Sequence, residues 1–169
     1  MLITKQTKLS EILKLGKKCD RKNNCCKHGS GFLAGDDLKN IARFLGITGD
    51  EMIKRYLEEK EMFNTKLYRP KLKGTDKPYG ECVFFDGEGC RINEVKPLQC
   101  KVGNCGKYGE ELSIWFMLNY LVNKDDTESI RQYDVYLNSG GKTIPGGRIE
   151  DLVPDKEKLN KILSFEVLK

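Results

Sequence analysis

The stretch CVFFDGEGCRINEVKPLQC (Cys82–Cys100) decides how this chain of 169 residues is interpreted. The turn-forming residues Asp86–Gly89 separate two short runs of apolar or β-favouring residues. This pattern predicts a β-hairpin over Cys82–Ile92. The hairpin would bring the thiols of Cys82 and Cys90 close together.

Cysteines are concentrated in one part of the chain, since all seven fall between residues 19 and 105. Thiolates are soft ligands that suit zinc and iron–sulfur clusters, and short loops let several sulfurs converge without straining the backbone. We therefore predict that the cysteines bind metal. The predicted ligands are Cys19, Cys25, Cys26, Cys82, Cys90, Cys100 and Cys105.

The segment Lys17–Gly35 is polar and rich in glycine, which predicts a loop. Because neighbouring side chains diverge, Cys25 and Cys26 would serve two sites, or one would bind metal while the other packs. His28 is the only histidine. It would bring the ligand count to eight, enough for two four-coordinate sites, although an exposed loop histidine is the simpler interpretation.

The composition indicates a globular protein of the cytoplasm, with 38% hydrophobic and 33% charged residues. The longest apolar run, Leu112–Val122, is too short to span a bilayer. The N-terminal residues lack the apolar block of a secretory signal. We expect no membrane association, and an odd number of cysteines in a reducing compartment favours metal or redox chemistry over disulfides.

The formal net charge of +5 is weak support for a nucleic-acid partner, because the lysines are mixed with Glu and Asp along the chain. The most basic segment is YRPKLKGTDKPYG (Tyr68–Gly80), which we interpret as a solvated connection. Nucleic-acid binding is not expected.

The spacing of apolar residues predicts a mostly α fold with one small β-hairpin, in which an irregular cysteine-rich metal-binding core is followed by C-terminal helices. We predict a cysteine-cluster domain over residues 1–106 and a helical extension packed on it over residues 107–169. The predicted helices cover residues 9–15, 36–45, 48–57, 110–124 and 128–137, with a last helix after Asp155.

These motifs together resemble the YkgJ-type CxxCxxCC cysteine-cluster family, which is described as a zinc- or iron-chelating domain. The resemblance covers residues 17–105, and Cys82–Cys100 follows the family's second pattern. The opening signature falls on Cys19, Lys22, Cys25 and Cys26. Lys22 stands where the family has a cysteine, which leaves seven sulfurs in place of eight.

The resemblance implies metal or cluster binding, either [4Fe–4S] or Zn²⁺. Cys82, Cys90, Cys100 and Cys105 would supply the four thiolates that either centre needs. Seven thiols with a single histidine favour an iron–sulfur cluster, and zinc stays open. The predicted role is metal handling, structural support or electron transfer, with the metal as the predicted partner.

An iron–sulfur enzyme is the alternative, either an oxidoreductase or a protein methyltransferase-like relative, since one branch of the family resembles a domain of flagellin lysine N-methylases. The only glycine-rich candidate for a cofactor loop is Gly29–Gly35. It follows a loop where a nucleotide-binding segment would follow a strand, so we interpret it as a flexible turn.

Overall fold

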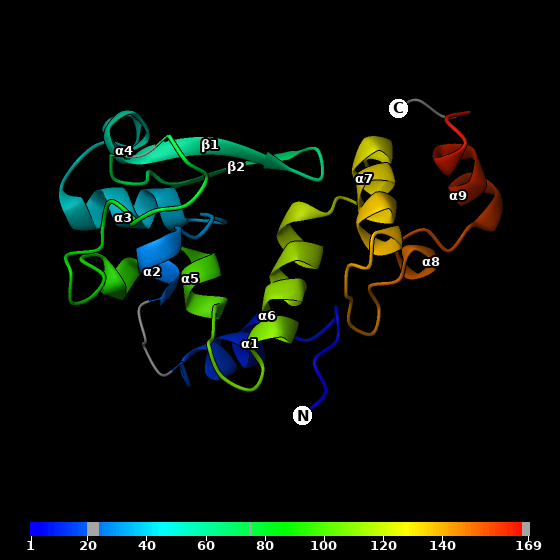
Figure 1. Ribbon diagram of the computed structural model, residues 1–169, viewed down its shortest axis with the longest axis horizontal. Coiled ribbons are helices and arrows are strands. Elements are labelled where there is room, and N and C mark those ends of the chain that lie inside the picture. Colours follow the sequence, from blue (N-terminus) through cyan, green and yellow to red (C-terminus); the bar gives the residue numbers. More distant parts are fainter. Residues whose placement is uncertain (20–23, 75, 167–169) are drawn as a thin grey trace.

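The computed structural model describes residues 1–19, 24–74 and 76–166 (Figure 1). Helices dominate this part of the chain, and β1 and β2 form a two-stranded antiparallel sheet, which confirms the predicted fold class. The elements are α1 (Leu9–Gly16), α2 (Asn24–His28), α3 (Asp37–Leu45), α4 (Gly49–Tyr56), β1 (Leu57–Met62), β2 (Thr65–Pro70), η1 (Asn93–Val95), α5 (Leu98–Val102), α6 (Gly109–Phe116), η2 (Met117–Leu121), α7 (Thr127–Asn138), α8 (Ile149–Leu152) and α9 (Lys156–Leu163).

Several helix ends lie where their capping residues predict. The Thr48 hydroxyl accepts a hydrogen bond from the Glu51 amide at 3.1 Å, and the Asp155 carboxylate accepts one from the Lys158 amide at 3.1 Å. Gly46 ends α3 in the left-handed region, with φ of 68°. The helix predicted over residues 110–124 is shorter, because α6 gives way to one π-helical turn, η2, that ends at Leu121.

The hairpin predicted over Cys82–Ile92 is wrong in its position. The two-stranded sheet lies upstream, where β1 pairs with β2 in a register that runs from Leu57 opposite Pro70 to Met62 opposite Thr65. Phe63 and Asn64 connect the strands with φ of 50° and 58°. Two successive positive φ values are those of a type I′ turn, which matches the natural twist of a hairpin.

Residues 82–92 form a tight turn with isolated bridges in place of strands. The Asp86 carboxylate accepts hydrogen bonds from the amides of Glu88 and Gly89, so the turn itself was correctly predicted. Phe84 and Phe85 are both buried, so the sequence does not alternate between core and solvent as a surface strand would. The bridge from Phe85 to Cys90 still folds the chain back on itself.

Two hydrophobic cores stabilise the molecule. The larger core collects side chains from α1, α5, α6, η2, α7, α8 and α9, and the smaller core lies among α3, α4, the start of β1 and residues 82–92. Ile12 and Val102 lie in the larger core with Leu112 and Phe116, so this core draws on both sides of residue 106. The domain boundary at residue 106 stays a prediction.

The β1–β2 hairpin connects the two cores. Leu57, at its base, belongs to the smaller core, and its tip reaches toward α7 (Figure 1). There the Phe63 ring packs edge-on against Tyr133 and Tyr136, with ring centroids 5.9 and 5.8 Å away. The Asn64 amide also donates to the Asp126 carboxylate at 2.8 Å. The hairpin therefore fixes the smaller core relative to the C-terminal helices.

Within the described ranges, no helix combines the length and apolar character required to cross a membrane.

Candidate metal centre

Five of the seven cysteines lie on three segments that meet beside the smaller core. Cys25 and Cys26 lie on α2, Cys82 and Cys90 flank the 82–92 turn, and Cys100 lies on α5. We call these five residues the thiol cluster. The Cys82 amide donates to the Cys26 carbonyl at 2.8 Å, and the Gly80 amide donates to the His28 carbonyl at 3.2 Å. These bonds attach α2 to the chain leading into the 82–92 turn.

The thiols of the cluster lie close enough to affect one another's ionisation. Burial raises the pKa of Cys82 and of Cys90, and each is raised further by the charge of Cys25. Burial also raises the pKa of Cys100 to about 12, with further contributions from Cys82, Cys25 and Cys90. Such a group of thiols resists holding several negative charges at once, unless a cation is present to neutralise them.

The adjacent pair Cys25 and Cys26 divides into a donor and an acceptor. The Cys26 thiol donates a hydrogen bond to the Cys25 sulfur, which lowers the pKa of Cys25 to about 6 and raises that of Cys26. Cys25 is exposed, whereas Cys26 packs on the smaller core. The pair thus presents the thiol with the lowered pKa outward and the thiol with the raised pKa inward.

A buried backbone segment supports the thiol of Cys100. The Gly31 amide donates a hydrogen bond to the Cys100 sulfur, which partly offsets the effect of burial on its pKa. A Cβ atom on Gly31 would lie 2.4 Å from that sulfur, far inside contact distance. The neighbouring Gln99 accepts from the Phe32 amide at 2.7 Å through its side chain, and its own amide donates to the Phe32 carbonyl at 3.3 Å.

Asp37 joins this segment to α5. Its carboxylate is buried and accepts hydrogen bonds from the Ala34 amide at 2.9 Å and from the Leu98 amide at 2.6 Å. Leu98 is the first residue of α5, two positions before Cys100. The carboxylate therefore fixes the start of the helix that carries this thiol.

Cys19 and Cys105 lie at the ends of two packed helices. Cys19 is half-buried just after α1, where its amide donates to the Gly16 carbonyl at 3.2 Å. Cys105 is exposed in the turn after α5, and the neighbouring Asn104 side chain donates to the Leu15 carbonyl at 2.8 Å. Among the described groups, the Cys19 thiol is not one of those that most change the pKa values of the thiol cluster.

His28 and Lys22 bear on the question of further ligands. His28 is exposed at the end of α2. Lys22, which replaces a signature cysteine, lies outside the described residues. In the ranges that the structure describes, no three Cys, His, Asp or Glu side chains form a preformed set of metal ligands. The thiols of the cluster are neighbours that must still draw together to bind one ion.

The donor chemistry of the cluster fits a thiophilic metal. Its five sulfurs come from a five-residue helix, a tight turn and a second short helix. A bound cation would offset both the burial and the mutual repulsion that contribute to the raised pKa values of Cys26, Cys82, Cys90 and Cys100. The residues that would hold it are Cys25, Cys26, Cys82, Cys90 and Cys100.

Two parts of this arrangement were missed in the sequence. The segment Gly29–Gly35 was interpreted as a flexible turn, yet Gly31 to Ala34 are buried and hydrogen-bonded. The available signal was Gly31 itself, followed directly by Phe32 and Leu33, because a glycine among apolar residues can mark a close approach of two segments. Cys100 lies on α5, a short helix that is not among those predicted from the sequence.

The chain belongs to the CxxCxxCC family. The profile of this family, described as "Putative zinc- or iron-chelating domain", matches residues 18–125. The match confirms the resemblance inferred from the cysteine motifs and extends it through α6 and η2. The chain is thus a member of a family of metal-chelating cysteine-cluster domains.

One curated relative is "Uncharacterized protein MJ0661" of Methanocaldococcus jannaschii. It is 34% identical over 89 residues, which cover 48% of this chain and 44% of the relative. The chain therefore spans less than half the length of this relative. No solved structure matches the chain.

Proposed function

We propose that this protein is a metal-chelating module in which the thiol cluster holds a single metal centre. The observation that carries the proposal is the meeting of five thiols from α2, the 82–92 turn and α5. Because these segments are far apart in the sequence, a metal bound by all three would also fasten the smaller core to α5.

We propose an iron–sulfur cluster as the bound group, with four of the five thiols as its ligands. The support is the composition of the cluster, which contains sulfur donors alone, and the exposure of His28, the chain's only histidine. Four thiolates suit a [4Fe–4S] cluster, which would give the protein electron transfer or cluster handling as its role. A structural zinc ion uses the same ligands and is the outcome to be distinguished.

The test is elemental and spectroscopic analysis of protein purified without oxygen. Iron with equimolar acid-labile sulfide and broad visible absorption would support the iron–sulfur assignment. Zinc in a colourless protein would assign the same thiols to a zinc site. Protein that takes up neither metal, even after reconstitution with iron, sulfide or zinc, would overturn the proposal.

Serine variants test which sulfurs bind. Cys82→Ser and Cys100→Ser should each remove most of the metal, because a missing thiolate leaves one coordination position open. Cys19→Ser is the matched control outside the cluster, and this variant should keep most of the metal. Full metal content in the Cys82 and Cys100 variants would contradict the grouping, and an equal loss in the control would extend the centre to Cys19.

A further inference from the structure

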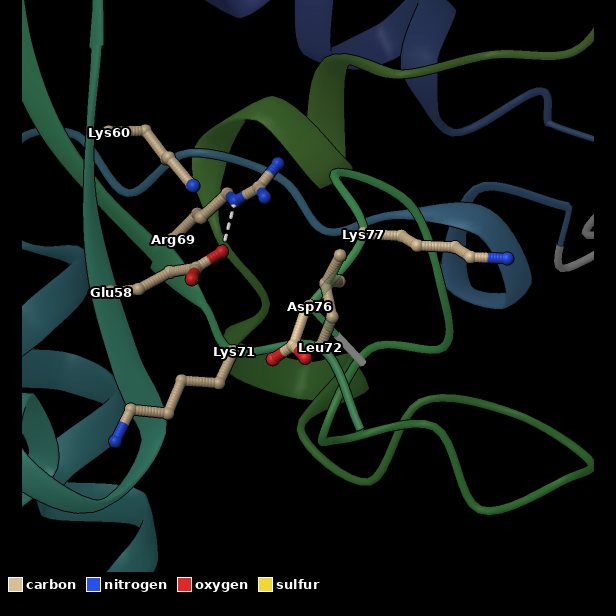
Figure 2. Close-up of a pocket in the computed structure, with 7 residues that line it drawn as sticks. All are labelled: Glu58, Lys60, Arg69, Lys71, Leu72, Asp76 and Lys77. Atoms are coloured by element: carbon tan, nitrogen blue, oxygen red, sulfur yellow. Dashed lines mark hydrogen bonds and ion pairs between the residues drawn. The ribbon is translucent and has the colours of Figure 1, made fainter. Parts of the chain in front are cut away.

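A charged cavity of about 290 Å³ lies on one face of the β1–β2 hairpin (Figure 2). This volume is at the lower end of small-molecule sites, so it admits a ligand of few atoms. Its walls contain no aromatic ring, which argues against recognition of a nucleobase. The lining residues are Glu58, Lys60, Arg69, Lys71, Leu72, Asp76 and Lys77.

Arg69 is held in a position that leaves most of its hydrogen-bonding capacity free. Its side chain is only 15% exposed, and its Nε donates to the Glu58 carboxylate at 2.7 Å. Among the described residues, its two terminal nitrogens have no hydrogen-bonding partner, and they point away from Glu58 (Figure 2). A guanidinium fixed in this way presents two parallel N–H donors, the geometry that binds carboxylate or phosphate.

Lys60 places a second positive charge on the same side of the hairpin. Lys60 pairs with Leu67, so it lies diagonally across from Arg69 on the same face of the sheet. Both side chains line the cavity, as Figure 2 shows, and within the described ranges Lys60 forms no ion pair. Two neighbouring cations repel each other, and an anion between them would relieve that repulsion.

The other polar groups of the cavity limit what it can bind. The Lys71 ammonium donates to the Lys54 carbonyl at 2.8 Å, and the Lys77 ammonium lies over the Tyr79 ring at 5.5 Å, so both are directed elsewhere. The Asp76 carboxylate lies across the cavity from Arg69 (Figure 2). The site therefore has two binding cations and two carboxylates, Glu58 paired with Arg69 and Asp76 facing it, which suits a compact anion better than a long polyanion.

We propose that this cavity binds a small multivalent oxyanion, inorganic phosphate or a small polycarboxylate, through Arg69 and Lys60. The site adjoins the thiol cluster, because Leu72 in its wall pairs with Cys82 and the Lys71 carbonyl accepts from the Val83 amide at 2.8 Å. The inference does not depend on metal binding by the cysteines, since none of the groups that contact the anion is a thiol.

Calorimetric titration of the purified full-length protein tests the site, with inorganic phosphate and citrate as separate ligands at pH 8. Lys60→Gln and Arg69→Gln should each weaken binding about ten-fold or more, the loss of one charge-assisted interaction. Lys66→Gln is the matched control, since Lys66 lies on the opposite face of the hairpin, and its affinity should stay within about two-fold. Tighter binding of phosphate or of citrate identifies the source of the oxyanion.

Asp76→Asn gives a test that misfolding cannot imitate. Because it removes a negative charge that faces the anion, it should raise the affinity for phosphate several-fold. Saturable binding of neither ligand by the unaltered protein would overturn the proposal. So would equal affinities in the Lys60 and Lys66 variants, or no gain from Asp76→Asn. Metal content, measured in the same samples, should not change, which separates this site from the thiol centre.

Discussion

At the scale of single residues, the thiol of Cys100 depends on contacts from residues far away in the sequence. Gly31 lies against its sulfur and donates to it, and Asp37 fixes the start of α5 through the Leu98 amide. Metal centres depend strongly on such supporting groups, because they hold each ligand in position before the metal arrives. Gly31 and Asp37 are therefore the residues where small changes should be most informative.

Gly31→Ala should lower both stability and metal content. Its new methyl group would lie 2.4 Å from the Cys100 sulfur and 3.1 Å from the Cys100 amide nitrogen, so the thiol must move. Overpacking of this kind costs about 1–3 kcal/mol, measurable by urea unfolding. Gly29→Ala is the control, since its nearest neighbour would be 3.9 Å away, an ordinary contact. Equal effects of the two changes would contradict the close approach at Gly31.

Asp37→Ala should destabilise the protein by about 2 kcal/mol or more, because it leaves the buried amides of Ala34 and Leu98 without their acceptor. Asp36→Ala provides the comparison, since Asp36 is exposed and its side chain makes no capping hydrogen bond to α3. The free energies of unfolding of both variants can be compared in urea. If Asp37→Ala lowered the free energy of unfolding by no more than Asp36→Ala does, the Asp37 carboxylate would not be what connects α3 to α5.

At the scale of elements, the β1–β2 hairpin connects the two cores. It is also the sheet that the sequence analysis placed wrongly, at Cys82–Ile92. β1 reads LEEKEM, whose charged residues favour strands weakly, so hydrophobic alternation did not reveal it. The strand is supported by its pairing, which includes the ion pair between Glu58 and Arg69 at 2.7 Å. Such cross-strand support becomes visible only once the partner strand is known.

Phe63→Ala should loosen the attachment of the hairpin tip to α7 and lower stability by about 1–3 kcal/mol, through the loss of two aromatic contacts and their buried area. The alanine would occupy the same left-handed turn position as Phe63, so the backbone strain is the same in the variant and in the unaltered protein. Phe44→Ala on α3 is the control, because Phe44 is 45% exposed and should cost less than about 0.5 kcal/mol. Thermal unfolding of both variants is the measurement. Equal melting temperatures would show that Phe63 does not attach the hairpin tip to α7.

At the scale of the whole molecule, the larger core ties the two ends of the chain together. Ile12 of α1 and Val102 of α5 share this core with Trp115 of α6 and Ile130 of α7. The family match ends at residue 125, yet side chains beyond it, including Tyr133 and Leu159, complete the same core. The C-terminal helices are therefore part of the packing that supports the cysteine-bearing region.

A fragment of residues 1–106 should lack a cooperative urea transition when chelator is present. Without residues 107–169, α1 and α5 keep their contact with each other but lose most of the side chains that complete the larger core, and the smaller core alone buries too little apolar surface. The full-length chain in the same chelator is the control and should unfold cooperatively. A fragment that unfolds at the same urea concentration as the full chain would show that residues 1–106 are an independent domain.

The sequence by itself determined the helical class, most helix ends, the turn at Asp86–Gly89 and the family. These features depend on local signals, namely apolar spacing, capping side chains and turn residues within a few positions of one another. The cysteine spacing likewise pointed to metal chelation without any knowledge of the fold.

Tertiary structure alone decided that the α2 thiols join Cys82, Cys90 and Cys100, where the sheet forms and what supports the site. The grouping of Cys25 and Cys26 with Cys82, Cys90 and Cys100 requires α2 and the 82–92 turn to be joined by backbone hydrogen bonds between residues more than fifty positions apart. Contacts of this kind follow from the packing of the whole chain, which no local pattern encodes. The same reason explains why Gly31, Asp37 and the Arg69 cavity emerged only from the folded molecule.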